Sequence, residues 1–183
     1  MMFPILPAYI KFKDCNEEIL TNVVLDNCSS GCWMLDSLVP DAVPVKEAKV
    51  NISTIEATNK STVCNFITQV SIESLNRSCK FEIPVVYTRN NESWPFSAKD
   101  IPSYKMIDNY EHLKNLPFNF CDKPVTLLIG MNMPSILCPQ EIVQRRPNEP
   151  FASLHTLGWA LNGPVEGKSR LLCNRIKSNL HIH

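Results

Sequence analysis

The hydrophobic and polar positions along the chain predict short strands separated by connections that contain proline. Two apolar segments near the start, 5–12 and 19–25, are joined by the polar residues Asp14-Cys15-Asn16, which suit a β-hairpin turn. Three further strand-like segments follow, at 48–55, 63–74 and 79–88. Because the 183 residues include 14 prolines and only 5 glycines, and Val, Ile and Thr are frequent, we expect mostly β structure.

Helical signals are few and short. A helical turn is expected at 33–39, before Pro40. After a long connection over 89–105, Asp108 and Glu111 have the spacing of a capping box, which predicts a short helix through Leu116. The chain is therefore expected to hold one or two short helices.

The last third of the chain predicts two more strands. The apolar run 125–129 stops at Gly130, and a mixed segment continues to Arg146. A single strand is expected over 151–161, followed by a short basic tail from Lys168.

Composition narrows the classes of partner. Eighteen basic and eighteen acidic residues give a formal net charge of zero, so we expect no direct nucleic-acid partner. No apolar run approaches the roughly 18 residues needed to cross a bilayer, and the start lacks a basic region before its short apolar stretch. The sequence therefore predicts neither a signal peptide nor a membrane partner, and a cytoplasmic location.

The cysteines and glycosylation sequons leave one alternative open. Eight cysteines could form a disulfide framework in a secreted protein, and five N-x-S sequons begin at Asn27, Asn51, Asn59, Asn76 and Asn91. Without a signal peptide, reduced thiols are the expectation. Since no C-x-x-C pair exists, we expect no metal and no other cofactor.

The candidate chemistry lies at the end of the second strand. The apolar run 21–25 ends abruptly at Asp26, which is followed by small polar residues. An aspartate at this position either forms a turn through its own backbone or acts as a catalytic acid. The residues alone leave both readings open.

Two separated segments fit one known pattern. The sequence Asp26-Asn27-Cys28-Ser29 follows an apolar strand, and about a hundred residues later Leu128-Ile129-Gly130 follows another. This layout resembles that of retropepsins, the aspartic proteases of retroviruses and LTR retrotransposons. The opening 5–12, the segment 125–137 and above all 149–165, with Leu157-Gly158-Trp159 and Gly163-Pro164, resemble the protease of BEL/Pao-type retrotransposon polyproteins.

The resemblance covers about residues 4–166 and implies a fold. We expect a retropepsin-like closed acid-protease β-barrel over 1–166, with a BEL/Pao-type strand extension from about 147, and a linker or tail over 167–183. In that family the protease precedes a reverse transcriptase and an integrase in one polyprotein.

The resemblance also implies a reaction. Aspartic proteolysis needs two carboxylates that share one proton, so that one takes a proton from a water molecule while the other polarises the scissile carbonyl. Only Asp26 fits the pattern, so we expect a homodimer in which two copies of Asp26 meet and hydrolyse peptide bonds, with the chain's own polyprotein as substrate. Asn27, Cys28 and Ser29 would form the active-site loop.

Other residues receive roles from the same resemblance. Leu128, Ile129 and Gly130 would form the supporting turn. The polar hairpin tip 54–62, with Glu56, Thr58 and Asn59, is the expected flap, although it lacks glycine. His155 and Trp159 are expected to pack rather than to catalyse.

Two departures from the family pattern favour an alternative. Cys28 replaces the usual glycine, and a Cβ there would cost roughly 1 kcal/mol or more if φ were positive. Asn27 stands where the family usually has Ser or Thr, whose hydroxyl ties the two active-site loops together, and its amide could make that tie instead. The alternative function is a catalytically silent retropepsin-like module for dimerisation or peptide binding, from a decayed element.

Overall fold

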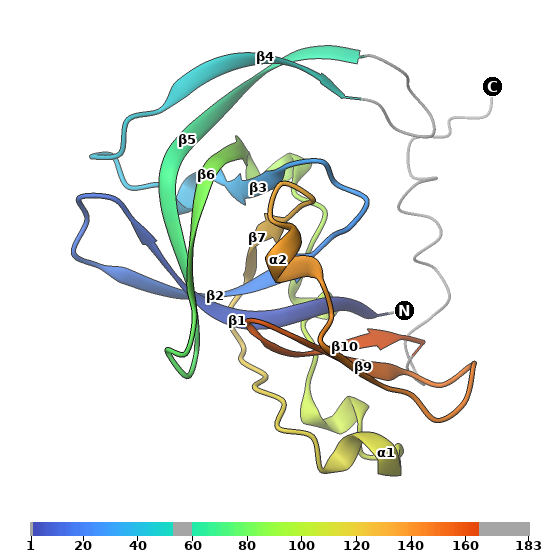
Figure 1. Ribbon diagram of the computed structural model, residues 1–183. Coiled ribbons are helices and arrows are strands. Elements are labelled where there is room, and N and C mark those ends of the chain that lie inside the picture. Colours follow the sequence, from blue (N-terminus) through green and yellow to red (C-terminus); the bar gives the residue numbers. More distant parts are fainter. Residues whose placement is uncertain (1, 53–59, 165–183) are drawn as a thin grey trace, which may run out of the picture.

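Six strands pair in a closed ring in the computed structural model, which describes residues 2–52 and 60–164 (Figure 1). The ring order is β1 (Met2–Phe12), β2 (Glu18–Leu25), β7 (Val125–Ile129), β3 (Cys32–Leu35), β6 (Lys80–Arg89) and β5 (Lys60–Ser74). Pairing of β5 with β1 closes the ring. The fold is therefore mainly β, as predicted, and its two α-helices have four residues each.

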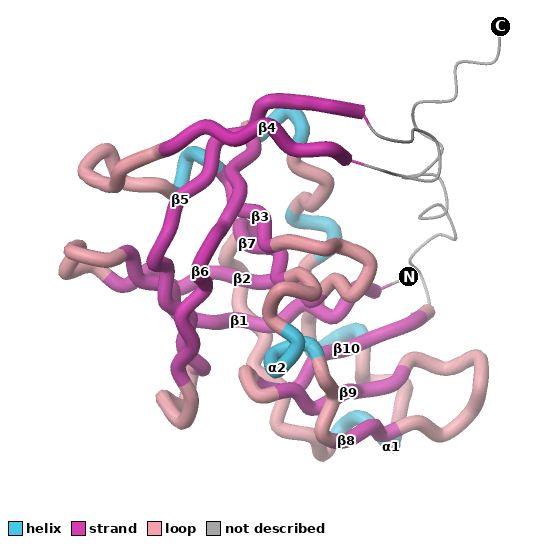
Figure 2. The backbone as a smooth tube through the Cα atoms, turned by 45° about the horizontal axis from the view of Figure 1, so that its top comes forward, coloured by secondary structure: helices cyan, strands magenta, loops and turns pink. Residues whose placement is uncertain are grey.

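Four more strands extend the sheet on two sides. β4 (Lys46–Ile52) pairs with β5 alone and is an edge strand. On the other side β10 (Gly158–Gly163) pairs with β1, followed by β9 (Phe151–His155) and β8 (Glu141–Val143). Figure 2 shows β10, β9 and β8 side by side beside the ring. Residues 141–163 thus add three strands to the same sheet at this edge.

The predicted hairpin of β1 and β2 is confirmed, with Pro7 opposite Asn22 in an antiparallel register. β2 also runs parallel to β7. At the start of β7, the buried Asn22 side chain donates hydrogen bonds to the carbonyls of Cys121 and Lys123, and Thr21 Oγ1 lies 2.6 Å from Thr126 Oγ1. Because each buried polar group has a partner, these bonds hold β7 in register against β2.

The prediction of a helical turn at 33–39 is wrong in its first part. Residues Cys32–Leu35 form β3, and only Asp36–Leu38 form a 3₁₀ turn. Cys32 and Met34 are both fully buried while Trp33 between them is partly exposed. This alternation has the period of a strand and not of a helix.

The predicted helix over 108–116 is shorter than expected and has another cap. α1 covers Glu111–Lys114, its N-cap is Tyr110, and no side chain caps it. A capping box exists instead at Ser97, whose amide and hydroxyl both donate to Asp100 in the connection between β6 and α1. The second helix, α2 (Pro134–Leu137), lies in the segment that was expected to be mixed.

The prediction of one strand over 151–161 is also wrong, because the segment folds back as the β9–β10 hairpin. Gly158 allows the reversal of the chain. Its φ of +136° is a conformation that glycine adopts easily because it has no Cβ. The hairpin carries a second hydrophobic core outside the ring, which it shares with the α1 segment. Trp159 packs there against Phe118, at a centroid distance of 6.5 Å, in agreement with the packing role expected for it.

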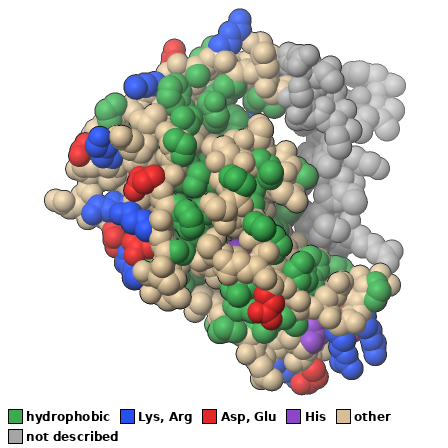
Figure 3. All heavy atoms as spheres, in the orientation of Figure 1, with side chains coloured by type: hydrophobic (Ala, Val, Ile, Leu, Met, Phe, Trp, Pro, Cys, Tyr) green, Lys and Arg blue, Asp and Glu red, His purple; other side chains and the backbone are tan. Residues whose placement is uncertain are grey.

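Charged side chains of both signs are interspersed on the face shown in Figure 3, and they gather over the β1–β2 and β5–β6 hairpins. Arg77, for example, bonds to Glu18 at 2.8 Å and to Glu73 at 3.0 Å, and its guanidinium lies 3.9 Å from the Tyr9 ring centroid. No helix in the described part of the chain is long and apolar enough to cross a bilayer.

His155 is buried in the extension and forms part of a polar chain. Its Nε2 lies 2.8 Å from Ser153 Oγ, which accepts a hydrogen bond from Asn162 Nδ2. Burial lowers the pKa of His155, and the nearby backbone of Ile136 and Leu137 opposes this only in part. The packing role expected of His155 agrees with its exposed fraction of 7%.

We expect the stability of the fold to decrease as the pH falls from 7.5 to 5. The folded state keeps His155 neutral, whereas the unfolded chain takes up a proton near pH 6.5, so protons favour unfolding below that value. His155→Gln should reduce the difference in Tm between the two pH values, measured by calorimetry. His181→Gln, at a position outside the described residues, is the control, and an equal pH dependence in wild type and His155→Gln would contradict the expectation.

Candidate active site

Asp26 stands at the carboxyl end of a fully buried strand segment. Residues 21–25 of β2 are all buried, and Asp26 is the first that is partly exposed. Because β2 and β7 are parallel, their carboxyl ends lie at the same edge of the ring. The Asp26 amide donates to the Ile129 carbonyl at 2.9 Å, which brings the two expected motif segments into contact.

Gly130 lets the two segments approach closely. The Met131 amide donates to the Ser29 carbonyl at 2.8 Å. A Cβ on Gly130 would lie only 2.3 Å from the carbonyl oxygen of Gly31 and 2.7 Å from that of Ser29. Only glycine fits there, since both near atoms belong to the backbone. Leu128 and Ile129, the other residues of this turn, are buried.

Hydrogen bonds within the loop fix its shape. Asp26 Oδ1 accepts from the Cys28 amide at 2.9 Å, and the Asp26 carbonyl accepts from the Ser29 amide at 3.3 Å. Ser29 Oγ donates to the Gly31 carbonyl at 2.8 Å. Asn27 is exposed, and its side-chain oxygen accepts only from Cys28 Sγ among the described residues. The cross-loop tie considered for Asn27 is therefore not seen within one chain.

Cys28 does not strain the loop. Among the described residues, the non-glycine residues with positive φ are Asp14, Gln69 and Arg77. Cys28 therefore keeps a φ that any residue adopts, and the cost expected for a Cβ in place of glycine does not arise. Its side chain is exposed.

Cys32 supports the loop through hydrogen bonds to the neighbouring Gly130 turn. Its thiol donates to Asn132 Oδ1 at 3.0 Å and accepts from the Gly130 amide at 3.4 Å. Burial raises the pKa of Cys32 to about 11, so the thiol stays neutral near pH 7. Cys32 is thus a structural link between β3 and the Gly130 turn, and it is one of seven cysteines in the described residues that are all free thiols.

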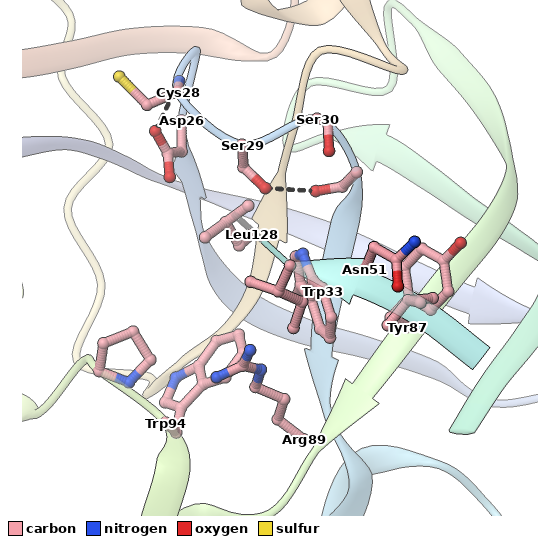
Figure 4. A pocket seen from close by; sticks show the side chains of 14 residues that line it. Asp26, Cys28, Ser29, Ser30, Trp33, Asn51, Tyr87, Arg89, Trp94 and Leu128 are labelled. Atoms are coloured by element: carbon pink, nitrogen blue, oxygen red, sulfur yellow. Dashed lines mark hydrogen bonds between the residues drawn. The ribbon is translucent and has the colours of Figure 1, made fainter. Parts of the chain in front are cut away.

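Asp26 lines a groove with a volume of about 530 Å³, within the range of ligand sites. The loop residues Cys28–Gly31 line the groove next to Asp26 (Figure 4). Elsewhere the groove is lined by aliphatic, aromatic and polar residues, which are Trp33, Val50, Asn51, Ile52, Tyr87, Arg89, Trp94, Pro95 and Leu128. The groove therefore joins one carboxylate to a surface that is partly apolar and partly polar.

Strand alternation creates the aromatic part of the groove. On β6, Val86 and Thr88 are buried in the ring, so Tyr87 and Arg89 point to the other face. Trp33 lies opposite Tyr87 in the parallel pair of β3 and β6, with a ring distance of 5.0 Å. Trp94 is fixed by a 2.7 Å hydrogen bond from its Nε1 to the Val125 carbonyl.

The wall of the groove comes from β4 through Val50, Asn51 and Ile52. β4 and β5 pair as far as Ile52 and Lys60, as two arms of a hairpin. The predicted flap residues Glu56, Thr58 and Asn59 lie outside the described residues.

Sequence reasoning missed the groove residues Trp33, Tyr87, Arg89 and Trp94. The alternation of Tyr87 and Arg89 with buried residues is a signal for a shared face. That signal does not say which strand lies opposite, so it could not have located a groove.

The described residues hold no group of three or more His, Cys, Asp or Glu side chains placed to bind a metal ion. Comparison with known proteins assigns no family, because no family model matches the chain and no curated protein matches it. The function therefore has to be inferred from the geometry of the site.

We expect Gly130→Ala to lower the free energy of unfolding by about 2–3 kcal/mol, because the Gly31 and Ser29 backbones must move away from the new Cβ. Urea denaturation measures the change. Gly31→Ala is the matched control, since a Cβ there first meets the Tyr87 ring at 3.4 Å. Equal stability of the two variants would show that the close approach at Gly130 is not tight in solution.

Proposed function

We propose that the chain is a retropepsin-like aspartic endopeptidase that acts as a homodimer, in the cytoplasm, on its own polyprotein. The observation that carries the proposal is the position of Asp26. Its loop is fixed by the Gly130 turn, and Asp26 lines a groove of about 530 Å³.

The groove favours an extended peptide as the substrate. β4 is an edge strand, so its outer backbone N–H and C=O groups can pair with a peptide that lies along it. Leu128 and the aromatic side chains of Trp33 and Tyr87 offer apolar surface for alternate side chains of that peptide. This combination of main-chain pairing and side-chain pockets is typical of peptide recognition.

The chemistry needs a second carboxylate. Of the described residues that line the groove, Asp26 is the only acid, so a single chain offers half of the pair. In the homodimer one Asp26 takes a proton from water while the neutral partner copy polarises the carbonyl. At about 3 Å and an effective dielectric near 20, two charged copies would repel by roughly 5 kcal/mol, which favours a shared proton.

The surface beside the loop favours self-association. Met131 is 50% exposed although it is a large apolar residue, and its amide is bonded to the Asp26 loop. Cys28 is exposed beside it in the same loop system. An apolar contact between two copies here would place both Asp26 residues near the two-fold axis.

We expect Asp26→Asn to reduce peptide cleavage by at least about a thousandfold, because the amide cannot accept a proton from water. Cut sites in a proteome-derived peptide library, read by mass spectrometry with and without pepstatin, measure activity. Asp36→Asn is the control, since Asp36 is exposed outside the groove. Equal cleavage by Asp26→Asn would refute the assignment, and peptide binding without any cleavage by wild type would favour the silent module.

We expect Met131→Lys to weaken the dimer by about tenfold or more, because it buries a charge in the contact between two copies. Sedimentation velocity over a concentration series measures the dissociation constant. Ile142→Lys is the matched control, since Ile142 is 57% exposed on the edge strand β8. A dimer that survives Met131→Lys but not Ile142→Lys would place the interface on the extension instead.

A further inference from the structure

Arg89 is held in the groove by its position in the sheet. It is the last residue of β6, it pairs with Leu35 of β3, and it shares the outward face with Tyr87. Its guanidinium carbon lies 4.6 Å from the centroid of the Trp33 ring. This cation–π contact orients the guanidinium over an aromatic surface, and no hydrogen bond joins its N–H donors to another of the described residues.

The charge of Arg89 has no acidic partner in the described part of the chain. The ion pairs found there join other residues, and Arg89 takes part in none of them. Arg77 shows the contrast, because its guanidinium contacts both Glu18 and Glu73 as well as the Tyr9 ring. Arg89 is also the only cation among the described residues that line the groove.

Arg89 and Asp26 lie at different ends of the same groove. Figure 4 shows Leu128 and Trp33 between them, with Arg89 beside Trp94 and away from the Asp26 loop. A peptide that lies along the groove therefore meets Arg89 with a side chain some residues away from the bond at Asp26. Arg89 is placed to select a substrate and not to take part in the chemistry.

We infer that Arg89 is a specificity-determining residue that selects an acidic side chain in the bound peptide. A carboxylate matches the guanidinium fork in a bidentate geometry, and a partly buried arginine without a partner gains most from such a ligand. The inference rests on the proposed function of the groove as a peptide site, and it names the substrate class as extended peptides with Glu or Asp at one position.

A nucleic acid fits these observations less well than an acidic peptide. A polyanion in the groove would bring its phosphates near the Asp26 carboxylate as well as near Arg89. On the face shown in Figure 3, basic side chains are interspersed with acidic ones, so that face offers no continuous basic track for a polyanion. A single cation in the groove matches the single carboxylate of an acidic side chain better than it matches a row of phosphates.

The test measures binding to the full-length Asp26→Asn protein, so that no peptide is cut. The probes are capped decapeptides with a background of the uncharged residues Val, Phe and Ser, which carry one Glu at each position in turn, and the same set with Gln in place of Glu. Calorimetry gives the affinities. We expect Glu to bind about fivefold more tightly than Gln at one position, with a preference that shrinks as salt increases.

Matched variants assign this preference to Arg89. Arg89→Gln should abolish it while the Gln peptides still bind, which shows that the groove is intact. Arg89→Lys should retain part of it, and Arg77→Gln, which removes a cation outside the groove, should leave it unchanged.

Four results would overturn the inference. Three of them are equal binding of Glu and Gln peptides to the protein with Arg89 intact, a Glu preference that persists in Arg89→Gln, and tighter Arg89-dependent binding of an oligouridylate. The fourth is the absence of binding by any peptide. A Glu preference in a protein whose wild type never cleaves peptides would leave the inference standing and refute the catalytic proposal, so the two failures are distinguishable.

Discussion

The close approach of Gly130 to the backbone of the Asp26 loop is the constraint on which the candidate site depends. Two hydrogen bonds, from Asp26 to Ile129 and from Met131 to Ser29, form across this contact. They hold only because no Cβ separates the chains. The carboxylate is therefore carried by two parallel strands and not by a free loop, which is the rigidity that a positioned acid requires.

The strands that carry this contact were predictable from the sequence, because each ends in a run of apolar residues. β7 is buried along its whole length and β2 is buried from Thr21 to Leu25, as expected of mainly apolar strands that are covered on both faces. The expectation that Gly130 belongs to a turn that supports the Asp26 loop came from the resemblance to retropepsins and not from spacing. A glycine after an apolar strand is a local signal, since it marks a position where the backbone must come close to another segment.

The groove and the extension were not predictable in the same way. Trp33, Tyr87 and Arg89 share a face only because β3 pairs with β6 in one register, and that pairing joins segments about fifty residues apart. The β9–β10 hairpin was missed because its turn, Thr156-Leu157-Gly158, lacks the usual turn residues before the glycine. Short strands such as β3 carry too few residues for their period to be recognised.

One edge of β1 pairs with two different strands, and this pairing affects how the chain folds while it is being synthesised. Ala8–Phe12 pair with β5, but Met2 and Ile5 pair with β10, the last described strand. During translation the start of β1 therefore stays without its neighbour until nearly the whole described chain has left the ribosome. The final pairing has to wait until β10 has been synthesised, and until it forms, the nascent chain exposes an open strand edge to chaperones or to other chains.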